Sequence, residues 1–140
     1  MQVGTWSVED VDRRENVIGR GLAAWATGSV VAGGALLASG RTAAGRQHLV
    51  WGAVDGAIAA RGLLTGADRR RPPSERARRL RRLLLLNAAL DSGYVAVGLA
   101  LRSGRLRPGA EQDGTAVVVQ GGFLLAFDLW HAGRLGRPPR

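Results

Sequence analysis

The sequence predicts an all-α integral membrane protein, a four-helix bundle with both termini in the cytoplasm. Apolar stretches of membrane-spanning length alternate with arginine clusters, and the longest uncharged run, residues 21–40, has 20 residues. A helix of that length rises about 30 Å, which matches the hydrocarbon core of a bilayer. We expect residues 1–140 to form one four-span domain.

Average composition hides this pattern because the charges are clumped. The hydrophobic content of 46% would suit a soluble protein, but all 20 basic residues are arginines, and eight of them lie between Arg69 and Arg82. The net charge of +9 is not read as nucleic-acid binding, because aromatic residues do not interleave with the arginines. An anionic membrane surface fits better. Without cysteine or any nucleotide-binding, nucleophile-elbow or zinc-helix motif, we expect no cofactor.

The chain opens with a polar segment, residues 1–16, in which Ser7 precedes Asp10 by three positions and weakly resembles a capping box. A short interfacial helix and an unstructured tail both fit this segment. The first span is expected at 17–38, with Arg20 at its start. Small residues that would let another helix approach closely form a ladder in this span: Ala24, Gly28 and Ala32.

The second span, at 47–66, is the weakest by apolar content because it holds Asp55 and Arg61. It is supported by its length and by a GxxxG face formed by Gly52 and Gly56.

A loop with two prolines follows, and Ser74 is a plausible N-cap for a third helix that starts several turns before its span at 81–102. Residues 103–114 form a loop, and the fourth span is expected at 115–135.

The two halves of the chain resemble each other. Shifted by 64 positions, Ser29–Arg41 aligns with Gly93–Arg105, including a shared Ser-Gly-Arg at the end of each segment. The alignment predicts two tandem αα-hairpin repeats in parallel orientation. A chance match between two simple sequences is the alternative.

Arginine asymmetry predicts the orientation. Five arginines fall in the two hairpin loops, and fifteen fall on the side of the termini and the central loop. Positive charge favours the cytoplasmic side, so both termini are expected there, in a bacterial inner (cytoplasmic) membrane. Arginine-only usage with abundant alanine and glycine suggests a GC-rich bacterial source. The Arg69–Arg82 run is expected to anchor the protein; binding of anionic lipids is the sharper alternative.

Polar residues within the spans are the candidate ligand or proton site: Asp55, Asn87, Asp91, Tyr94, Gln120, Asp128 and His131. On each helix they share one stripe, so we expect them to meet inside the bundle. Asp91 should lie near the midplane, where a carboxylate costs about 2.5–3.5 kcal/mol or more.

Two interpretations of this polar seam stay open. Intramembrane Asn, Gln and Tyr side chains commonly serve as structural hydrogen-bond partners between helices. The three carboxylates cannot all stay ionised in a low dielectric without partners. Arg20 and Arg61 are the available cations, and Asp91 and Asp128 are the candidates for proton, cation or ligand handling. His48 and His131 should lie nearly a membrane thickness apart, so no metal site is expected.

Three segments, Trp51–Leu64, Leu86–Gly98 and Gln120–His131, resemble small bacterial four-span membrane proteins classed as a domain of unknown function. The resemblance implies a four-helix membrane fold and no activity. Such relatives often carry Asn in the second span where this chain has Asp55, so the resemblance implies no general role for that carboxylate.

The function expected from sequence is binding of a small ligand, or conduction of a proton or ion, by the polar seam. One alternative is a membrane-embedded isomerase or cyclase with a buried aspartate as general acid. Another is a structural subunit of a membrane complex. The sequence names no catalytic residue, and a homo-oligomer of short four-span chains is compatible with it.

Overall fold

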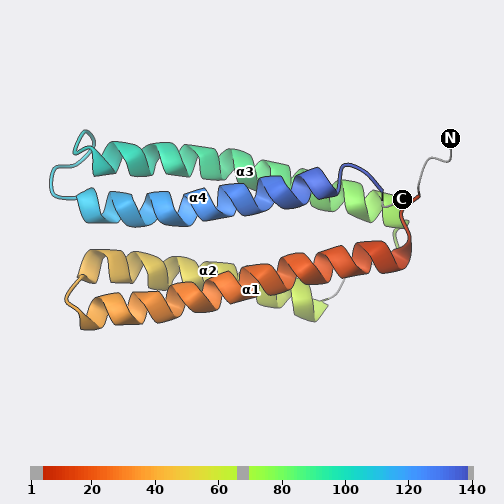
Figure 1. Cartoon of the computed structure of the whole chain (residues 1–140), viewed down its shortest axis with the longest axis horizontal. Helices are drawn as coiled ribbons and strands as arrows, with labels where there is room; N and C mark the ends of the chain where they lie inside the picture. Colours follow the sequence, from red (N-terminus) through yellow and green to blue (C-terminus); the bar gives the residue numbers. More distant parts are fainter. Residues whose placement is uncertain (1–4, 66–69, 139–140) are drawn as a thin grey trace.

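The computed structural model describes residues 5–65 and 70–138, and in that part of the chain all regular structure is helical. The helices are α1 (Val8–Ala38), α2 (Thr42–Thr65), α3 (Pro73–Arg102) and α4 (Glu111–Arg134). They run up and down as two hairpins, α1 with α2 and α3 with α4 (Figure 1). The prediction of an all-α four-helix fold is confirmed.

Each hairpin closes through the same local turn. Gly40 and Gly104 both have positive φ, at +79° and +69°, a conformation that glycine adopts without steric cost. Their amides donate to Leu37 and Leu101, and the serine before each glycine caps its helix by donating its hydroxyl to a carbonyl three residues earlier. These turns are the two Ser-Gly-Arg segments that the repeat alignment pairs. The internal repeat itself stays a prediction.

The N-terminal segment differs from both expectations for it. The Asp10 amide donates to the Ser7 hydroxyl, so α1 begins at Val8 and continues unbroken for 31 residues through the expected first span. Val11 is fully buried, and Trp6 packs beside it. Residues 8–16 are therefore neither a separate helix nor a tail, because Val11 has a partner surface on α3 and α4.

Ser74 is not the N-cap of α3, so that prediction is wrong. The N-cap lies two residues earlier, at Pro72, so the helix starts at Pro73 and has no side-chain cap. Proline suits a first helical turn because its missing N–H has no partner there anyway.

Glycines bring the helices of each hairpin into backbone contact. A Cβ on Gly33 would lie 2.9 Å from the carbonyl oxygen of Gly45, and one on Gly52 would lie 3.0 Å from that of Ala26. In the second hairpin, a Cβ on Gly114 would collide with the Arg102 backbone. Only hydrogen fits at such approaches.

The small-residue ladder predicted in the first span does not make this contact within the chain. Ala24, Gly28 and Ala32 are all exposed, and the neighbouring face of α1, with Ala26 and Gly33, packs against α2 instead.

The surface of the bundle is apolar. Leu64 is 85% exposed, Val31 68% and Leu86 58%. Helices α1, α3 and α4 are long and apolar enough to cross a membrane. Over the described residues α2 does not reach that measure, in keeping with its weak apolar content.

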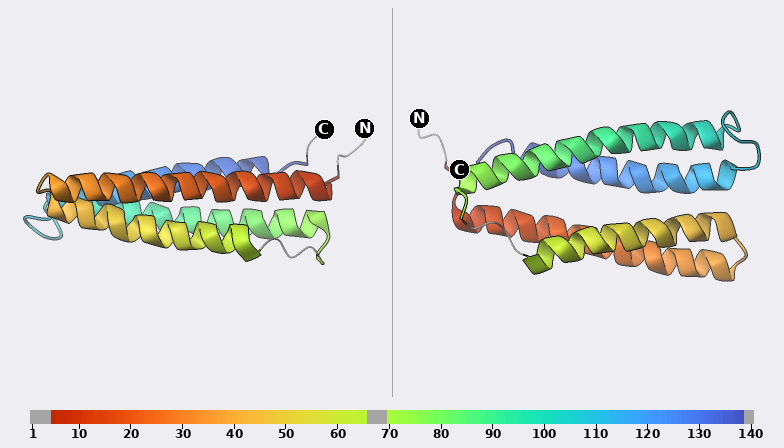
Figure 2. Two further views of the ribbon diagram at one scale, coloured as in Figure 1. Left: turned by 90° about the horizontal axis from the view of Figure 1, so that it is seen from below. Right: turned by 180° about the vertical axis from the view of Figure 1, so that it is seen from behind.

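One end of the bundle is longer than the other. The first turns of α1 and α3 extend beyond the last turns of α2 and α4, and the two termini lie at this end (Figure 2). A small core of Val11, Ala77, Leu84, Ala132 and Leu135 holds these overhanging turns together. The hairpin turns lie at the opposite end (Figure 1). Arg69 and Arg140, which enter the predicted charge asymmetry, fall outside the described residues.

Candidate functional site

The middle of the bundle holds a short chain of polar side chains that joins the two hairpins. Gln120 on α4 donates from Nε2 to Asp55 Oδ2 on α2 at 2.8 Å, and its Oε1 accepts from the Ser29 hydroxyl on α1 at 3.4 Å. All three residues are buried, at 2%, 3% and 3% exposure. Gln120 thus uses both ends of its amide to connect three helices.

A cavity of about 230 Å³ lies beside these polar side chains, between the hairpins. Five of the seven candidate residues line it: Asp55, Asn87, Asp91, Tyr94 and Asp128. Apolar residues complete the wall: Leu22, Val54, Ile58, Leu90, Leu124 and the ring of Trp51. Of the remaining candidates, Gln120 touches the site through Asp55, and His131 does not line it.

The three carboxylates of the cavity differ in burial. Asp55 and Asp128 are buried, Asp91 is half-buried, and Asn87 is exposed. Asn87 on α3 and Asp128 on α4 line the same cavity. Asp55 has an amide partner in Gln120. Sequence reasoning placed most weight on Asp91, which is the least buried of the three.

No cation lines the cavity among the described residues. Arg20 and Arg61, the expected charge partners, are both exposed and outside it. With three carboxyl groups and no cation in its lining, the cavity suits a proton or another cation much better than an anion.

The buried cation of the structure is Arg76, which sequence reasoning missed. Its Nη2 lies 2.5 Å from Asp12 Oδ1 and 2.7 Å from Glu15 Oε2, and its side chain is 4% exposed. Burial lowers the pKa of Arg76, but the hydrogen bonds and charges of Glu15 and Asp12 outweigh it and leave the pKa above its ordinary value. In the sequence, Arg76 is one member of a basic run, and nothing marks it as the inward-facing one.

Aromatic contacts also join the hairpins. The rings of Trp25 and Phe123 stack with centroids 3.6 Å apart, and Trp51 meets Tyr94 edge-on at 4.8 Å. Trp25 and Trp51 thus pack between helices, whereas Trp130 is 62% exposed.

The structure offers no metal site within its described residues, where no group of three or more His, Asp or Glu side chains could hold an ion. His48 lies in the first two turns of α2 and His131 near the end of α4. His131 instead packs on Phe127, with ring centroids 4.5 Å apart.

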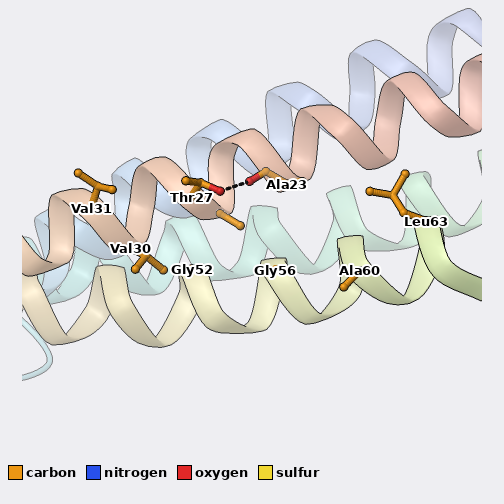
Figure 3. Close-up of a pocket in the computed structure, with 9 residues that line it drawn as sticks. Ala23, Thr27, Val30, Val31, Gly52, Gly56, Ala60 and Leu63 are labelled. Carbon is orange, nitrogen blue, oxygen red and sulfur yellow. Dashed lines mark hydrogen bonds between the residues drawn. The ribbon is translucent and has the colours of Figure 1, made fainter.

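A larger hollow of about 440 Å³ lies between α1 and α2, and its wall is apolar (Figure 3). Ala23, Val31, Gly56 and Leu63 are among its lining residues, and Thr27 satisfies its own hydroxyl by donating to the Ala23 carbonyl. This hollow therefore has, among its lining residues, no side-chain donor free to hydrogen-bond a ligand. The carboxylate cavity, although smaller, is the candidate functional site.

Comparison with known proteins gives a family and no activity. No curated protein and no solved structure matches this chain. A family described as "Family of unknown function (DUF6992)" matches residues 21–129, a range that includes the whole cavity. Because the match covers well over half of the sequence, the chain belongs to DUF6992, a family of unknown function.

Proposed function

We propose that this chain is a small four-span integral membrane protein whose inter-hairpin cavity binds a small ligand or conducts protons or ions. The observation that carries the proposal is the cavity itself. It brings Asp55, Asp91 and Asp128 from three helices to one space of about 230 Å³, with no lining cation among the described residues. Carboxylates inside a bilayer cost free energy, so their presence there indicates a function.

The distribution of side chains supports the membrane location. Large aliphatic residues such as Leu64 and Val31 face outward, whereas Gln120 and Asp55 are among the best-buried side chains. In water this arrangement would leave a wide apolar surface exposed. In a bilayer the same surface faces lipid, and the polar groups satisfy one another inside.

The arginines support an orientation. Most arginines lie at the end that carries both termini, and few lie at the hairpin turns. We propose that both termini are cytoplasmic, in a bacterial cytoplasmic membrane, and that the two hairpins descend from a duplicated unit. The exposed Arg78, Arg79 and Arg82 would face anionic lipid headgroups. The exposed face with Gly28 is available to a second copy of the chain.

The test reconstitutes the purified chain in liposomes and measures proton and monovalent-cation flux under an imposed gradient. Asp55→Asn and Asp128→Asn are expected to abolish flux, because an amide keeps the shape but cannot take up or release a proton. Glu9→Gln, at an exposed site in the first turn of α1, is the matched control and should behave like the unmodified chain.

Other outcomes separate the alternatives. Turnover of a lipophilic substrate in detergent without a gradient, lost in Asp128→Asn, would instead indicate an enzyme with a buried general acid. A chain that neither binds, conducts nor turns over anything, but co-purifies in a fixed ratio with a membrane complex, would indicate a structural subunit. Either result overturns the proposal.

A further inference from the structure

The parallel pair α2 and α4 contains a second polar level, nearer the hairpin turns than the carboxylate cavity. His48 lies seven residues before Asp55 on α2, and Asp113 lies seven residues before Gln120 on α4. Asp55 and Gln120 are hydrogen-bonded at 2.8 Å. Because α2 and α4 run in the same direction, two residues displaced equally along both helices face each other again.

Seven residues are nearly two helical turns, so the displaced pair keeps the angular position of the bonded pair to within about 20°. The same displacement carries it about 10 Å along the bundle. His48 and Asp113 therefore lie in the α2–α4 seam, on the hairpin-turn side of Asp55.

Both side chains have a buried polar atom without a partner. His48 Nδ1 and Asp113 Oδ1 are inaccessible, and neither makes a hydrogen bond. Buried polar atoms are nearly always satisfied, and an exception at two facing titratable residues calls for an explanation. An imidazole is a common general acid or base, and a neighbouring carboxylate is a common partner that orients it.

The other charged residues near this end of α2 and α4 are exposed or lie outside the seam. On α4, Glu111 is exposed and accepts from the Gly109 amide. On α3, the Arg102 backbone lies against Gly114, beside Asp113. Arg46 is exposed on α2 itself, and residues 21–38, the part of α1 nearer the hairpin turn, are uncharged. His48 and Asp113 are thus the titratable residues of the α2–α4 seam at this end of the bundle.

We propose that His48 and Asp113 form an outer proton-exchange site that supplies Asp55. This inference rests on the proposed function, because it assigns the side from which the cavity is protonated. A proton from water at the hairpin-turn end binds the pair, moves along the α2–α4 seam through water, and ends on the Asp55 carboxylate. The pair then returns to its starting state, so one proton moves and no other bond changes.

The first experiment tests the geometry. Because the chain has no cysteine, the double variant His48→Cys/Asp113→Cys can be oxidised and its free thiols counted by mass spectrometry. We expect cross-linking of this pair, because neighbouring positions in the α2–α4 seam can reach the short Cβ–Cβ distance that a disulfide needs once the helices fluctuate. The control pair Val50→Cys/Asp113→Cys, with Val50 60% exposed, should not cross-link. Equal behaviour of the two pairs overturns the proposal.

The second experiment tests the chemistry in liposomes with an acid pulse on the hairpin-turn side. His48→Ala and Asp113→Asn should each slow proton uptake by roughly 100-fold, the lower end of what a positioned acid or base contributes. Imidazole in the outer buffer should restore the rate of His48→Ala, which a purely structural histidine would not allow. Glu111→Gln is the control and should keep the full rate.

The outcomes separate this inference from the proposed function. If Asp55→Asn abolishes flux while His48→Ala and Asp113→Asn keep the full rate, the cavity conducts and the outer site is refuted. If the pair cross-links but the unmodified chain passes no protons, the pair is structural and proton conduction fails with it. A His48→Ala variant that is slow, folded and not rescued by imidazole also overturns the assignment.

Discussion

Helices meet in two different ways in this protein, within the hairpins and between them. Within a hairpin, backbones approach so closely that Gly33, Gly45 and Gly114 admit only hydrogen. Between hairpins, long side chains fill the space, with Trp25 stacked on Phe123 and Gln120 bonded to Asp55. The carboxylate cavity lies where the second kind of contact applies, whereas the hollow within the first hairpin has an apolar wall.

The largest effect should come from Gly114→Ala in the second hairpin. Its Cβ would meet the Arg102 backbone and the Gly98 carbonyl oxygen, and neither is a flexible side chain that can move away. We expect the free energy of unfolding, measured by denaturant titration in detergent, to fall by about 3 kcal/mol or more. Gly28→Ala, where a Cβ meets nothing within 4 Å, is the control. A mild effect at Gly114 would show that the hairpin can open, and would weaken the comparison.

Arg76→Ala is expected to be the most damaging change between hairpins, because it leaves Asp12 and Glu15 without their buried partner. Breaking such a pair costs about 3–5 kcal/mol, and the lower value applies here because both carboxylates are partly exposed. Thermal melting in detergent would measure the loss, with the exposed neighbour Arg78→Ala as control. Equal losses in the two variants would mean that α1 and α3 are held by the small apolar core instead.

The first hairpin allows a comparison between adjacent residues. Gly33→Ala would press a methyl group against Leu49 and the Gly45 carbonyl oxygen, whereas Gly34→Ala meets nothing within 4 Å. We expect a loss of about 2 kcal/mol for Gly33→Ala and almost none for Gly34→Ala. The same denaturant titration measures both. A reversed order would place the wrong face of α1 against α2.

Gln120→Leu should have the smallest of these effects on stability. It removes the donor to Asp55, and an unsatisfied buried polar group costs about 1–3 kcal/mol. Replacing both partners, as Gln120→Leu/Asp55→Leu, should recover most of that loss, because only the Ser29 hydroxyl, which donates to Gln120 at 3.4 Å, then loses a partner. Such recovery, together with loss of flux, would show that this hydrogen bond serves function more than stability. If the double variant is worse than both single variants, the seam is structural.

The sequence predicts the architecture better than it predicts the contacts between side chains. Long uncharged runs and the Ser-Gly-Arg segments mark the helices and turns, since these depend on local chemistry. Helical periodicity also predicts part of the cavity wall, because Asn87, Asp91 and Tyr94 share one face of α3 and all three line the cavity.

Choices among equivalent residues could not be predicted. Arg76 is one arginine in a basic run, and only the facing Asp12 and Glu15 distinguish it. Ala24–Gly28–Ala32 and Ala26–Gly33 are equally small stripes of α1, and only the position of α2 decides between them. Asp113 lies in what looks like a loop, so its seam with His48 becomes visible only once α2 and α4 are known to be parallel neighbours.

In the proposed membrane location, the overhanging turns of α1 and α3 would determine the depth at which the bundle rests in lipid. Helices of 31 and 30 residues rise about 45 Å, against about 36 Å for the 24 residues of α2 and α4. The extra length carries Asp12, Glu15 and Arg76, which favour the headgroup and water region over hydrocarbon. A thicker bilayer cannot draw these turns inward without burying that charge, so the bundle would have to meet hydrophobic mismatch by straightening or by thinning its lipid surroundings.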